Sequence, residues 1–561
     1  MIGRLRNLVR KHVARARLRR LGRHRVRLQA GERKSFLLWV PGGMPLMLDV
    51  EGAIAVSLGL RGHDVHAVIC DGTASACIKR EIGINPDMST WSQECGPCRR
   101  SCEEKLKDLG IGYSSIGDHV SAAERTALRR HADEVNWETL AQLEHAGINV
   151  GRNVQSSVLR YFKGEKYNGD PALLREYAYA GLVSLTAARN ACEARKATDI
   201  VMSHGIYADW GPPLRAALAR GMHATCWGGS YLHARFYFRH PSDYKDDLDF
   251  HRLDKGSWER ESKAPLAERE AARLNAFLTN RYVKGVSYDI KTSRTYRGAT
   301  EHIRAKYGLR EGRRVWGLMT HVNWDAVTDY SPMLFEDFDR WILSTIEHLA
   351  NDSAADWLIK VHPGEGWHNP RTGIQALVQR HYPSLPAHIH LIRYDDNISP
   401  LDFFNLVDGA VTVYGTSGLE ISCLGKPTIV AGAAHYSRKG FTYDPDTVED
   451  YFRLIGSVQD IPPLTEAQRQ LALRYAYIYF VRRQIPFPPV ENPDAPREHG
   501  FWKFDSRRSA MLLPGGNRYV DFIARRIVDH GEFVLPEELL DEPVGPEMAG
   551  LASPSKDAAR L

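Results

Sequence analysis

Apolar runs of five or six residues alternate with longer amphipathic stretches along most of the chain, which predicts strands alternating with helices. In the first half, strands are expected at residues 35–40, 65–70, 199–203 and 223–227, with helices near 50–61 and 213–220. A second series has strands expected at 315–320, 357–361, 388–392, 410–414 and 427–431 and helices at 335–350, after Pro370, at 401–407 and at 417–424. A long helix is expected at 465–483 and a short one near 519–529.

Strands and helices that alternate at this spacing form parallel sheets covered by helices on both faces. The two series are separated by a polar stretch near residues 285–312. The sequence therefore predicts an α/β fold of two doubly wound, Rossmann-like domains that face a cleft, with ligands at the carboxyl ends of the strands. The expected domains are 35–300 and 301–485, with an N-terminal arm at 1–34 and a Pro-rich C-terminal extension carrying a short helix at 486–561.

The net charge of +6 on 561 residues is unevenly distributed. Residues 1–34 contain 13 Lys and Arg and one acid, so the remainder of the chain is net −6. In this arm the apolar positions recur every three or four residues, at Ile2, Leu5, Val9, Val13 and Ala16. That is the pattern of a basic amphipathic helix, which can lie on the anionic inner face of a membrane. The alternative is a solvated tail. No nucleic-acid partner is expected, because the arm lacks interleaved aromatic residues and the body is acidic.

The composition excludes several classes of protein. With 43% hydrophobic and 25% charged residues, the chain is neither disordered nor collagen-like. No stretch provides the roughly 20 apolar residues of a spanning helix, and no apolar run follows the basic arm as in a secretory signal. The 8 cysteines are too few for a disulfide scaffold. We therefore expect a cytoplasmic protein, peripheral on the cytoplasmic membrane face.

The strongest candidate chemistry lies at the strand ends of the second series. The strand at 357–361 runs directly into His362-Pro363, and proline ends strand pairing there. Lys360 lies two residues before His362, on the same side of the strand. A histidine and a lysine at a strand end suit phosphate binding or leaving-group stabilisation, and we assign His362 a catalytic as well as a donor-binding role.

A second candidate turn follows the strand at 410–414. Gly415, Thr416 and Ser417 stand at a strand–helix junction, where backbone N–H groups and hydroxyls attract anions. Glu420 is a candidate acceptor for ribose hydroxyls. The alternative is a capping box, with Thr416 or Ser417 as the N-cap and Glu420 as its partner. The basic loop around Arg438 and Lys439 is a candidate for neutralising a diphosphate.

These motifs resemble those of bacterial capsular or surface polysaccharide biosynthesis proteins of the cell envelope, which are GT-B-like glycosyltransferases. The resemblance is carried by Lys-Val-His-Pro-Gly-Glu (360–365), Gly-Thr-Ser-Gly-Leu-Glu (415–420), Gly-Lys-Pro-Thr-Ile-Val-Ala-Gly (425–432), Arg-Lys-Gly-Phe-Thr (438–442) and Thr-His-Val-Asn-Trp-Asp (320–325). The His-Pro turn paired with a later Thr-Ser also resembles bacterial sialyl- and Kdo-transferases, in which both elements hold the CMP of the donor. The resemblance is specific over 315–455 and weaker over 35–230.

The resemblance implies a two-domain enzyme that transfers a sugar from a nucleotide-sugar donor, with a CMP-sugar favoured, to a growing glycan or glycolipid acceptor. It implies that His362, Thr416 and Ser417 contact the donor nucleotide. Teichoic acid glycerophosphotransferases share the Lys-x-His-Pro turn but carry an Asp-Tyr-Ser-Ser pattern, where this chain has Val413-Tyr-Gly-Thr-Ser417. That difference favours the capsular group.

An inverting sugar transfer needs a base for the acceptor hydroxyl, usually a carboxylate on the first domain. The candidates are Glu51 and Asp209, with Asp49 as a third. The alternative roles are a helix N-cap for Asp49 and a favourable first-turn charge for Glu51. His204 and Tyr207 follow a strand and are expected to face the cleft. Asp325 also ends a strand, where it would orient the donor or a metal, or cap a surface helix.

Half of the cysteines fall within 26 residues, at Cys77, Cys95, Cys98 and Cys102. The Cys95-x2-Cys98 spacing is a metal knuckle, and Cys98 and Cys102 share one helix face. Four thiolates would hold a structural zinc ion or, alternatively, an iron–sulfur cluster. The other interpretations are reduced buried thiols and a redox disulfide between Cys95 and Cys98. No organic cofactor is expected.

Two other functions fit the same motifs. A phosphotransferase or nucleotide-sugar epimerase would use the same anion site without a polymer acceptor. A non-catalytic scaffold of the polysaccharide assembly machinery would use the arm and the cysteine knuckle for assembly instead.

Overall fold

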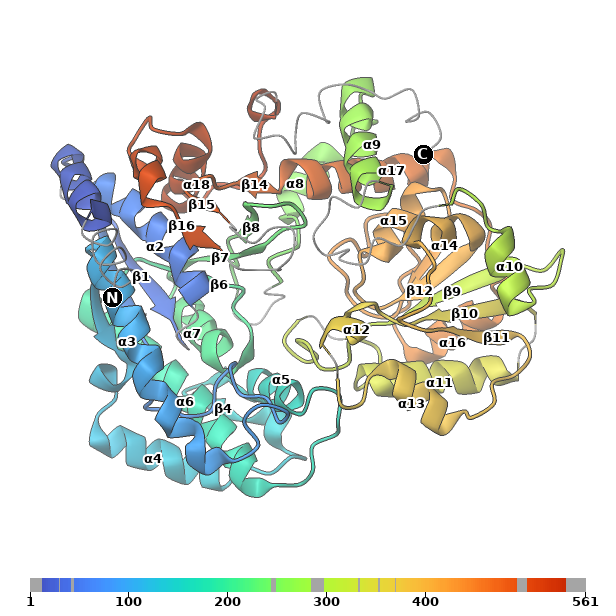
Figure 1. The fold of residues 1–561 in the computed structure, drawn as a ribbon, viewed down its shortest axis with the longest axis horizontal. Coiled ribbons are helices and arrows are strands. Elements are labelled where there is room, and N and C mark those ends of the chain that lie inside the picture. Colours follow the sequence, from blue (N-terminus) through green and yellow to red (C-terminus); the bar gives the residue numbers. More distant parts are fainter. Residues whose placement is uncertain are drawn as a thin grey trace, which may run out of the picture.

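The computed structural model describes residues 13–29, 31–41, 45–243, 249–283, 297–330, 333–351, 354–368, 370–491 and 502–540. Two sheets with helices on both faces form two domains that lie side by side (Figure 1). The predicted fold class of two doubly wound domains is confirmed.

The first sheet has seven strands in the order β14-β8-β7-β6-β1-β2-β3. Its five parallel strands are β1 (Ser35–Val40), β2 (Asp64–Ile69), β3 (Gly112–Ser115), β6 (Asp199–Ser203) and β7 (His223–Gly229). β8 (Arg235–Arg239) and β14 (Ile485–Pro486) extend it with antiparallel pairing. The strand order reverses between β1 and β6, which makes that point the topological switch of the sheet.

Successive side chains of β1 enter different cores, as the two-residue period of a strand requires. Leu37 and Trp39 pack with α6 (Pro171–Arg195) and α7 (Tyr207–Ala219). Phe36 packs on the opposite face with α2 (Pro45–Leu60) and α18 (Arg518–Asp529). The other elements of this half are α3 (Trp91–Leu109), α4 (Ala122–Asp133), β4 (Glu144–His145), β5 (Ile148–Asn149), α5 (Gly151–Phe162), α8 (Lys255–Glu261) and α9 (Glu268–Tyr282).

The second sheet is wholly parallel, in the order β11-β10-β9-β12-β13. Its strands are β9 (Val315–Met319), β10 (Asp356–Lys360), β11 (Ile389–Ile392), β12 (Gly409–Thr412) and β13 (Thr428–Val430). The surrounding helices are α10 (Glu301–Tyr307), α11 (Phe338–Ala350), α12 (Gly364–His368), α13 (Ile374–His381), α14 (Pro400–Leu406), α15 (Ser417–Cys423) and α16 (Val448–Gly456). Here the strand order reverses between β9 and β12.

The chain then returns to the first domain through α17 (Glu466–Tyr477), as Figure 1 shows in orange and red. A π-helical turn at Ile478–Arg482 follows it, so one helical run spans the predicted 465–483. After β14, the short strands β15 (Val490–Glu491) and β16 (Lys503–Phe504) pair with each other. α18 packs on α2, and the Arg61 guanidinium pairs with Asp521 of α18. The segment expected as an extension therefore packs on the first domain.

The described part of the arm also packs on the body. Residues 13–21 are helical, Leu18 is buried, and Arg15 pairs with Asp108 at the end of α3. This stretch is therefore not the solvated tail that was the alternative to a membrane-bound helix. Its predicted apolar positions Ile2, Leu5 and Val9 lie outside the described residues. Within the described part of the chain, every helix is too short or too polar to cross a membrane.

Candidate functional site

The candidate site is centred on the switch point of the second sheet, where β9 and β12 end side by side. His321 follows β9 and reaches across to the turn after β12. Its Nε2 accepts hydrogen bonds from the backbone N–H of Tyr414, at 2.9 Å, and of Gly415, at 3.2 Å. Burial, and secondarily the nearby His362, lower the pKa of His321 to about 3. The ring is therefore neutral at physiological pH, as an accepting Nε2 requires.

The His362 turn is attached to the same point through Thr320. The Thr320 hydroxyl donates to the carbonyl of Lys360 at 3.1 Å and accepts from the backbone N–H of His362 at 3.0 Å. The Nδ1 atom of His362 accepts from the N–H of Gly364 at 3.0 Å. In the neutral ring the proton is therefore on Nε2, and the side chain is exposed. The exposed imidazole can thus donate a hydrogen bond to a phosphate oxygen.

The turn of Gly415, Thr416 and Ser417 leads into α15. The Thr416 hydroxyl makes no capping hydrogen bond, so the alternative interpretation of a capping box with Thr416 as the N-cap does not hold. The Tyr436 hydroxyl donates to the carbonyl of Gly415 at 2.6 Å. A Cβ atom on Gly418 would lie 2.2 Å from that tyrosine oxygen, so only glycine fits beside it. Hydrogen bonds from Tyr436 and to His321 hold the backbone of Tyr414 and Gly415, where the resemblance expects the donor nucleotide.

The other predicted donor residues have partners of their own. Glu420 and Arg281 of α9 form a buried ion pair, with 3.3 Å between Oε1 and Nε. The Lys360 ammonium lies over the ring of Phe403, 5.7 Å from its centre. Arg438 is exposed and pairs with Asp446, and Lys439 is half-buried in the same loop. The structure therefore attaches the His362 turn to Thr320 and the turn after β12 to the neighbouring His321, while Arg438 is engaged by Asp446.

The two predicted catalytic carboxyls of the first domain are both buried. Glu51 of α2 accepts a hydrogen bond from Trp227 Nε1 at 3.2 Å, and its Oε2 has no hydrogen-bond partner among the described residues. Burial raises the pKa of Glu51 to about 8. Asp209 of α7 accepts from the N–H of Ile78 at 2.8 Å, and burial raises its pKa to about 6. Asp49 pairs with Lys105 at 2.5 Å.

The two domains meet where Tyr207 contacts the loop after β9. The Tyr207 hydroxyl donates to Asp325 and accepts from the N–H of Ala326 at 3.1 Å. The backbone N–H of Tyr207 donates to Asp329 at 2.9 Å. Tyr207 and Ala326 have φ values of 64° and 51°, a left-handed conformation that non-glycine residues rarely adopt. Such strain persists only where surrounding contacts impose it, and it concentrates at functional sites.

The same junction contains His204 and Asp329. Burial lowers the pKa of His204 to about 4 and raises the pKa of Asp329 to about 6. Asp329 accepts a further hydrogen bond from Asn153 of α5 at 2.6 Å. The sequence analysis did not identify Asp329 or Asn153. Nothing in their local sequence distinguishes them, because their roles arise from contact between segments 176 residues apart.

The structure places three of the four predicted cysteine ligands together and the fourth apart from them. Cys77, Cys95 and Cys98 line a small hollow with Cys70, but Cys102 is turned toward the sheet and packs in an apolar cluster with Leu38. Across the described residues, no group of three or more His, Cys, Asp or Glu is arranged to hold a metal ion. Burial raises the pKa of Cys77, Cys95 and Cys102, which disfavours the thiolates that zinc or an iron–sulfur cluster needs.

A family model matches part of the chain. The family model described as "Capsule polysaccharide biosynthesis protein" matches residues 325–482. The predicted resemblance to capsular polysaccharide biosynthesis proteins is thereby confirmed for that stretch, which contains both candidate donor turns. A search of curated protein sequences gives no match.

Solved structures give remote likenesses. A β-Kdo 2,4-transferase, KpsC of Thermosulfurimonas dismutans, aligns with 15% identity and a TM-score of 0.30, covering 50% of this chain and 79% of its own. A UDP-GlcNAc 2-epimerase from Neisseria meningitidis aligns with 9% identity and a TM-score of 0.24, covering 79% and 95%. The glycosyltransferase SnogD from Streptomyces nogalater aligns with 12% identity and a TM-score of 0.24, covering 81% and 97%.

Proposed function

We propose that the protein is a glycosyltransferase that transfers a sugar from a nucleotide-sugar donor, preferably a CMP-sugar, to a growing capsular or surface polysaccharide. One observation carries the proposal: His321 and Thr320 tie the His362 turn and the Gly415–Ser417 turn to one point at the switch of the second sheet. Both turns lie within the stretch matched by the capsule polysaccharide family, residues 325–482.

In this proposal the donor phosphate lies between the two turns. His362 Nε2 and the hydroxyls of Thr416 and Ser417 donate hydrogen bonds to its oxygens. As the bond between sugar and phosphate breaks, negative charge develops on the leaving nucleotide, and donors fixed in advance stabilise it without reorganisation. The neutral His321 holds the second turn in place and does not titrate near neutral pH.

The acceptor hydroxyl must lose its proton as the new glycosidic bond forms. We propose Glu51 as that base and Asp209 as the alternative, both with a pKa raised toward the range useful for proton transfer. The acceptor is a glycan or glycolipid. The protein works at the cytoplasmic face of the membrane, with residues 1–34 as its contact to the anionic lipid surface.

Nucleotide binding tests the proposal directly. CMP, UDP and GDP are added to the full chain, and the melting temperature is measured with and without each nucleotide. A ligand at 100 times its Kd stabilises the folded state by about 2.7 kcal/mol, which raises the melting temperature measurably. His362→Ala and Ser417→Ala should reduce that shift. The matched control is His381→Ala, an exposed histidine of α13 in the same domain. No shift with any nucleotide, or equal shifts in all variants, would refute the proposal.

Product analysis separates the alternatives. A glycosyltransferase releases nucleotide only when an acceptor is present, whereas an epimerase converts its nucleotide sugar without one. Full capsule production by cells carrying His362→Ala together with Glu51→Ala would favour a non-catalytic scaffold.

A further inference from the structure

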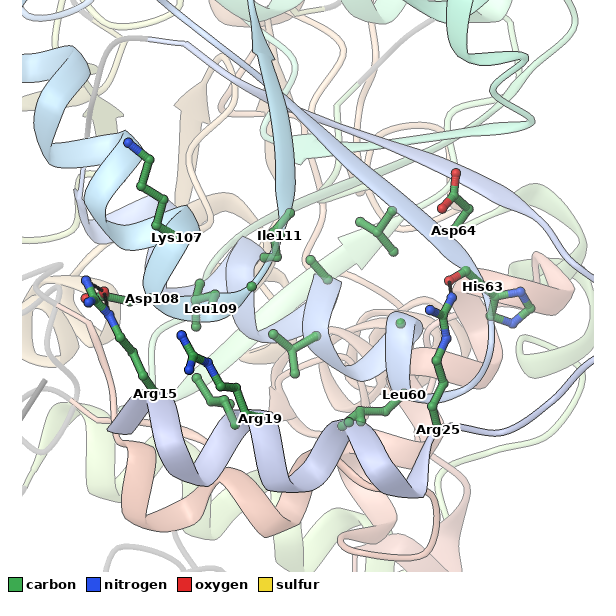
Figure 2. Close-up of a pocket in the computed structure, with 17 residues that line it drawn as sticks. Arg15, Arg19, Arg25, Leu60, His63, Asp64, Lys107, Asp108, Leu109 and Ile111 are labelled. Carbon is green, nitrogen blue, oxygen red and sulfur yellow. Dashed lines mark hydrogen bonds and ion pairs between the residues drawn. The ribbon is translucent and has the colours of Figure 1, made fainter. Parts of the chain in front are cut away.

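A hollow of about 350 Å³ lies between the arm helix (residues 13–21), the last turn of α2 and the end of α3 (Figure 2). Asp64 and Ile111, which border it, lie where β2 and β3 begin. The hollow is therefore at the amino edge of the first sheet, opposite the edge at which the carboxyl ends of its strands meet. It is separate from the proposed nucleotide site.

The rim of the hollow is cationic. Four basic residues, Arg15, Arg19, Arg25 and Lys107, and two carboxylates, Asp64 and Asp108, line it, an excess of two positive charges among the lining residues. Lys107 also pairs with Glu103, 3.7 Å away, which is not among those lining residues. Arg15 is paired with Asp108, and Arg25 donates to the carbonyl of His63 at 2.9 Å. Arg19 makes no hydrogen bond or ion pair with any residue that the structure describes, and its guanidinium points toward Leu109 across the hollow in Figure 2.

The floor of the hollow is apolar. It is formed by Leu18, Ala55, Val56, Leu60 and Leu109. Gly59, in the last turn of α2, also lines it, and a Cβ atom there would meet nothing within 4 Å. Glycine within a helix costs about 0.8–1 kcal/mol relative to alanine, and packing does not require it here. At Gly52 of the same helix, by contrast, a Cβ would lie 2.3 Å from Leu109.

We infer that this hollow binds the headgroup and first methylene groups of an acidic phospholipid. The excess positive charge of the rim matches the phosphate, and the apolar floor matches the methylene groups that a free phosphate lacks. One ligand class satisfies both features. The inference rests on the membrane contact in the proposed function, which it makes specific: the arm and the body together hold one lipid molecule.

The test uses the full chain and a soluble probe, dihexanoyl-phosphatidylglycerol, with binding measured by calorimetry. Arg19→Ala should weaken binding about fivefold, since each basic residue near an anionic lipid contributes about 1 kcal/mol. Arg17→Ala is the matched control, because Arg17 is exposed on the same helix and does not line the hollow. Gly59→Leu fills the floor and should abolish binding while the melting temperature stays at or above that of the wild type.

Three results would overturn the inference. If glycerol 3-phosphate binds as tightly as the lipid, the hollow is a site for free anions. If dihexanoyl-phosphatidylcholine binds equally, the rim charge is not used. If Arg17→Ala weakens binding as much as Arg19→Ala, the attraction is diffuse charge.

A vesicle experiment and a nucleotide control complete the design. Vesicles of phosphatidylglycerol should sediment the wild type and the Arg17→Ala variant but much less of the Gly59→Leu variant. The CMP-induced melting shift should be the same in wild type and Gly59→Leu, because the nucleotide site is on the other domain. Loss of lipid binding with an intact CMP shift therefore tests the lipid site alone. Absence of any nucleotide shift in the wild type tests the proposed enzyme instead.

Discussion

Replacing Glu51 by Gln should change how stability depends on pH. The Glu51 carboxyl is buried beside Trp227, and burial raises its pKa from 4.5 to about 8. The unfolded chain releases this proton near pH 4.5, whereas the folded protein keeps it until about pH 8. Stability from this group is therefore fully present below pH 4.5 and is lost as the pH rises through 8. At about 1.4 kcal/mol for each pH unit, the loss is about 5 kcal/mol.

Glutamine has the same shape, accepts the same hydrogen bond from Trp227 and cannot ionise. Glu51→Gln and wild type should therefore melt together at pH 4.5, while the variant melts higher at pH 8.5. For an unfolding unit of about 300 residues, the difference is on the order of 8 °C. The assay is thermal unfolding followed across this pH range. The control is Glu347→Gln, an exposed glutamate of α11, which should show no such divergence.

Activity should respond in the opposite direction if Glu51 is the base. The carboxylate must be deprotonated to accept the acceptor proton, so kcat/KM of the wild type should rise with pH up to about 8. Glu51→Gln should lose turnover while its nucleotide-induced melting shift is retained. If the melting temperatures of variant and wild type differ by the same amount at every pH from 4.5 to 8.5, the electrostatic reasoning is refuted. Retained turnover in the variant would refute the catalytic role.

Three further predictions follow from buried contacts. His321→Ala removes the acceptor of two backbone N–H groups, and each such group costs about 1–3 kcal/mol when it is left unpaired. The turn after β12 should then lose its fixed position, and CMP affinity measured by calorimetry should fall at least tenfold. Unchanged affinity would show that His321 does not support the site. Tyr207→Phe deletes the hydroxyl that joins the two domains, so limited proteolysis should cut the 320–330 loop faster than in wild type, and an unchanged rate would show that the junction does not depend on it. Metal analysis of the purified protein should find less than one zinc ion per chain, and a stoichiometric ion lost in Cys95→Ser would contradict the thiol geometry described above.

The sequence predicted the second domain more completely than the first. Its strands and helices alternate in short units, and each expected strand from 315–320 to 427–431 overlaps an observed one. In the first domain, the helices from α4 to α6 were not predicted. α6 is buried along most of its length, so its residues lack the polar stripe that marks a surface helix. α7 contains Pro212 and Pro213, and the pattern placed its start six residues late.

The residues of the candidate site were likewise predicted only in part. His362, Thr416 and Ser417 were identifiable because each lies in a short motif at the end of a strand. His321 was seen only as part of a motif, since its role as a hydrogen-bond acceptor depends on the strand order that places β9 beside β12. The sequence also did not show how the four cysteines are divided between two environments. A spacing of two residues allows two thiols to converge, but the packing of α3 on the sheet directs Cys102 to the apolar side.

The return of the chain to its first sheet has a consequence for synthesis on the ribosome. β14 covers the edge of β8, and α18 covers α2 and the strand face that includes Phe36. The contact between Arg61 and Asp521 joins residues 460 positions apart. The sheet of the first domain therefore cannot be completed until the second domain has been translated. Until then an apolar face and a sheet edge are open to other chains. A fragment ending near residue 300 should be a client of chaperones rather than an independent domain.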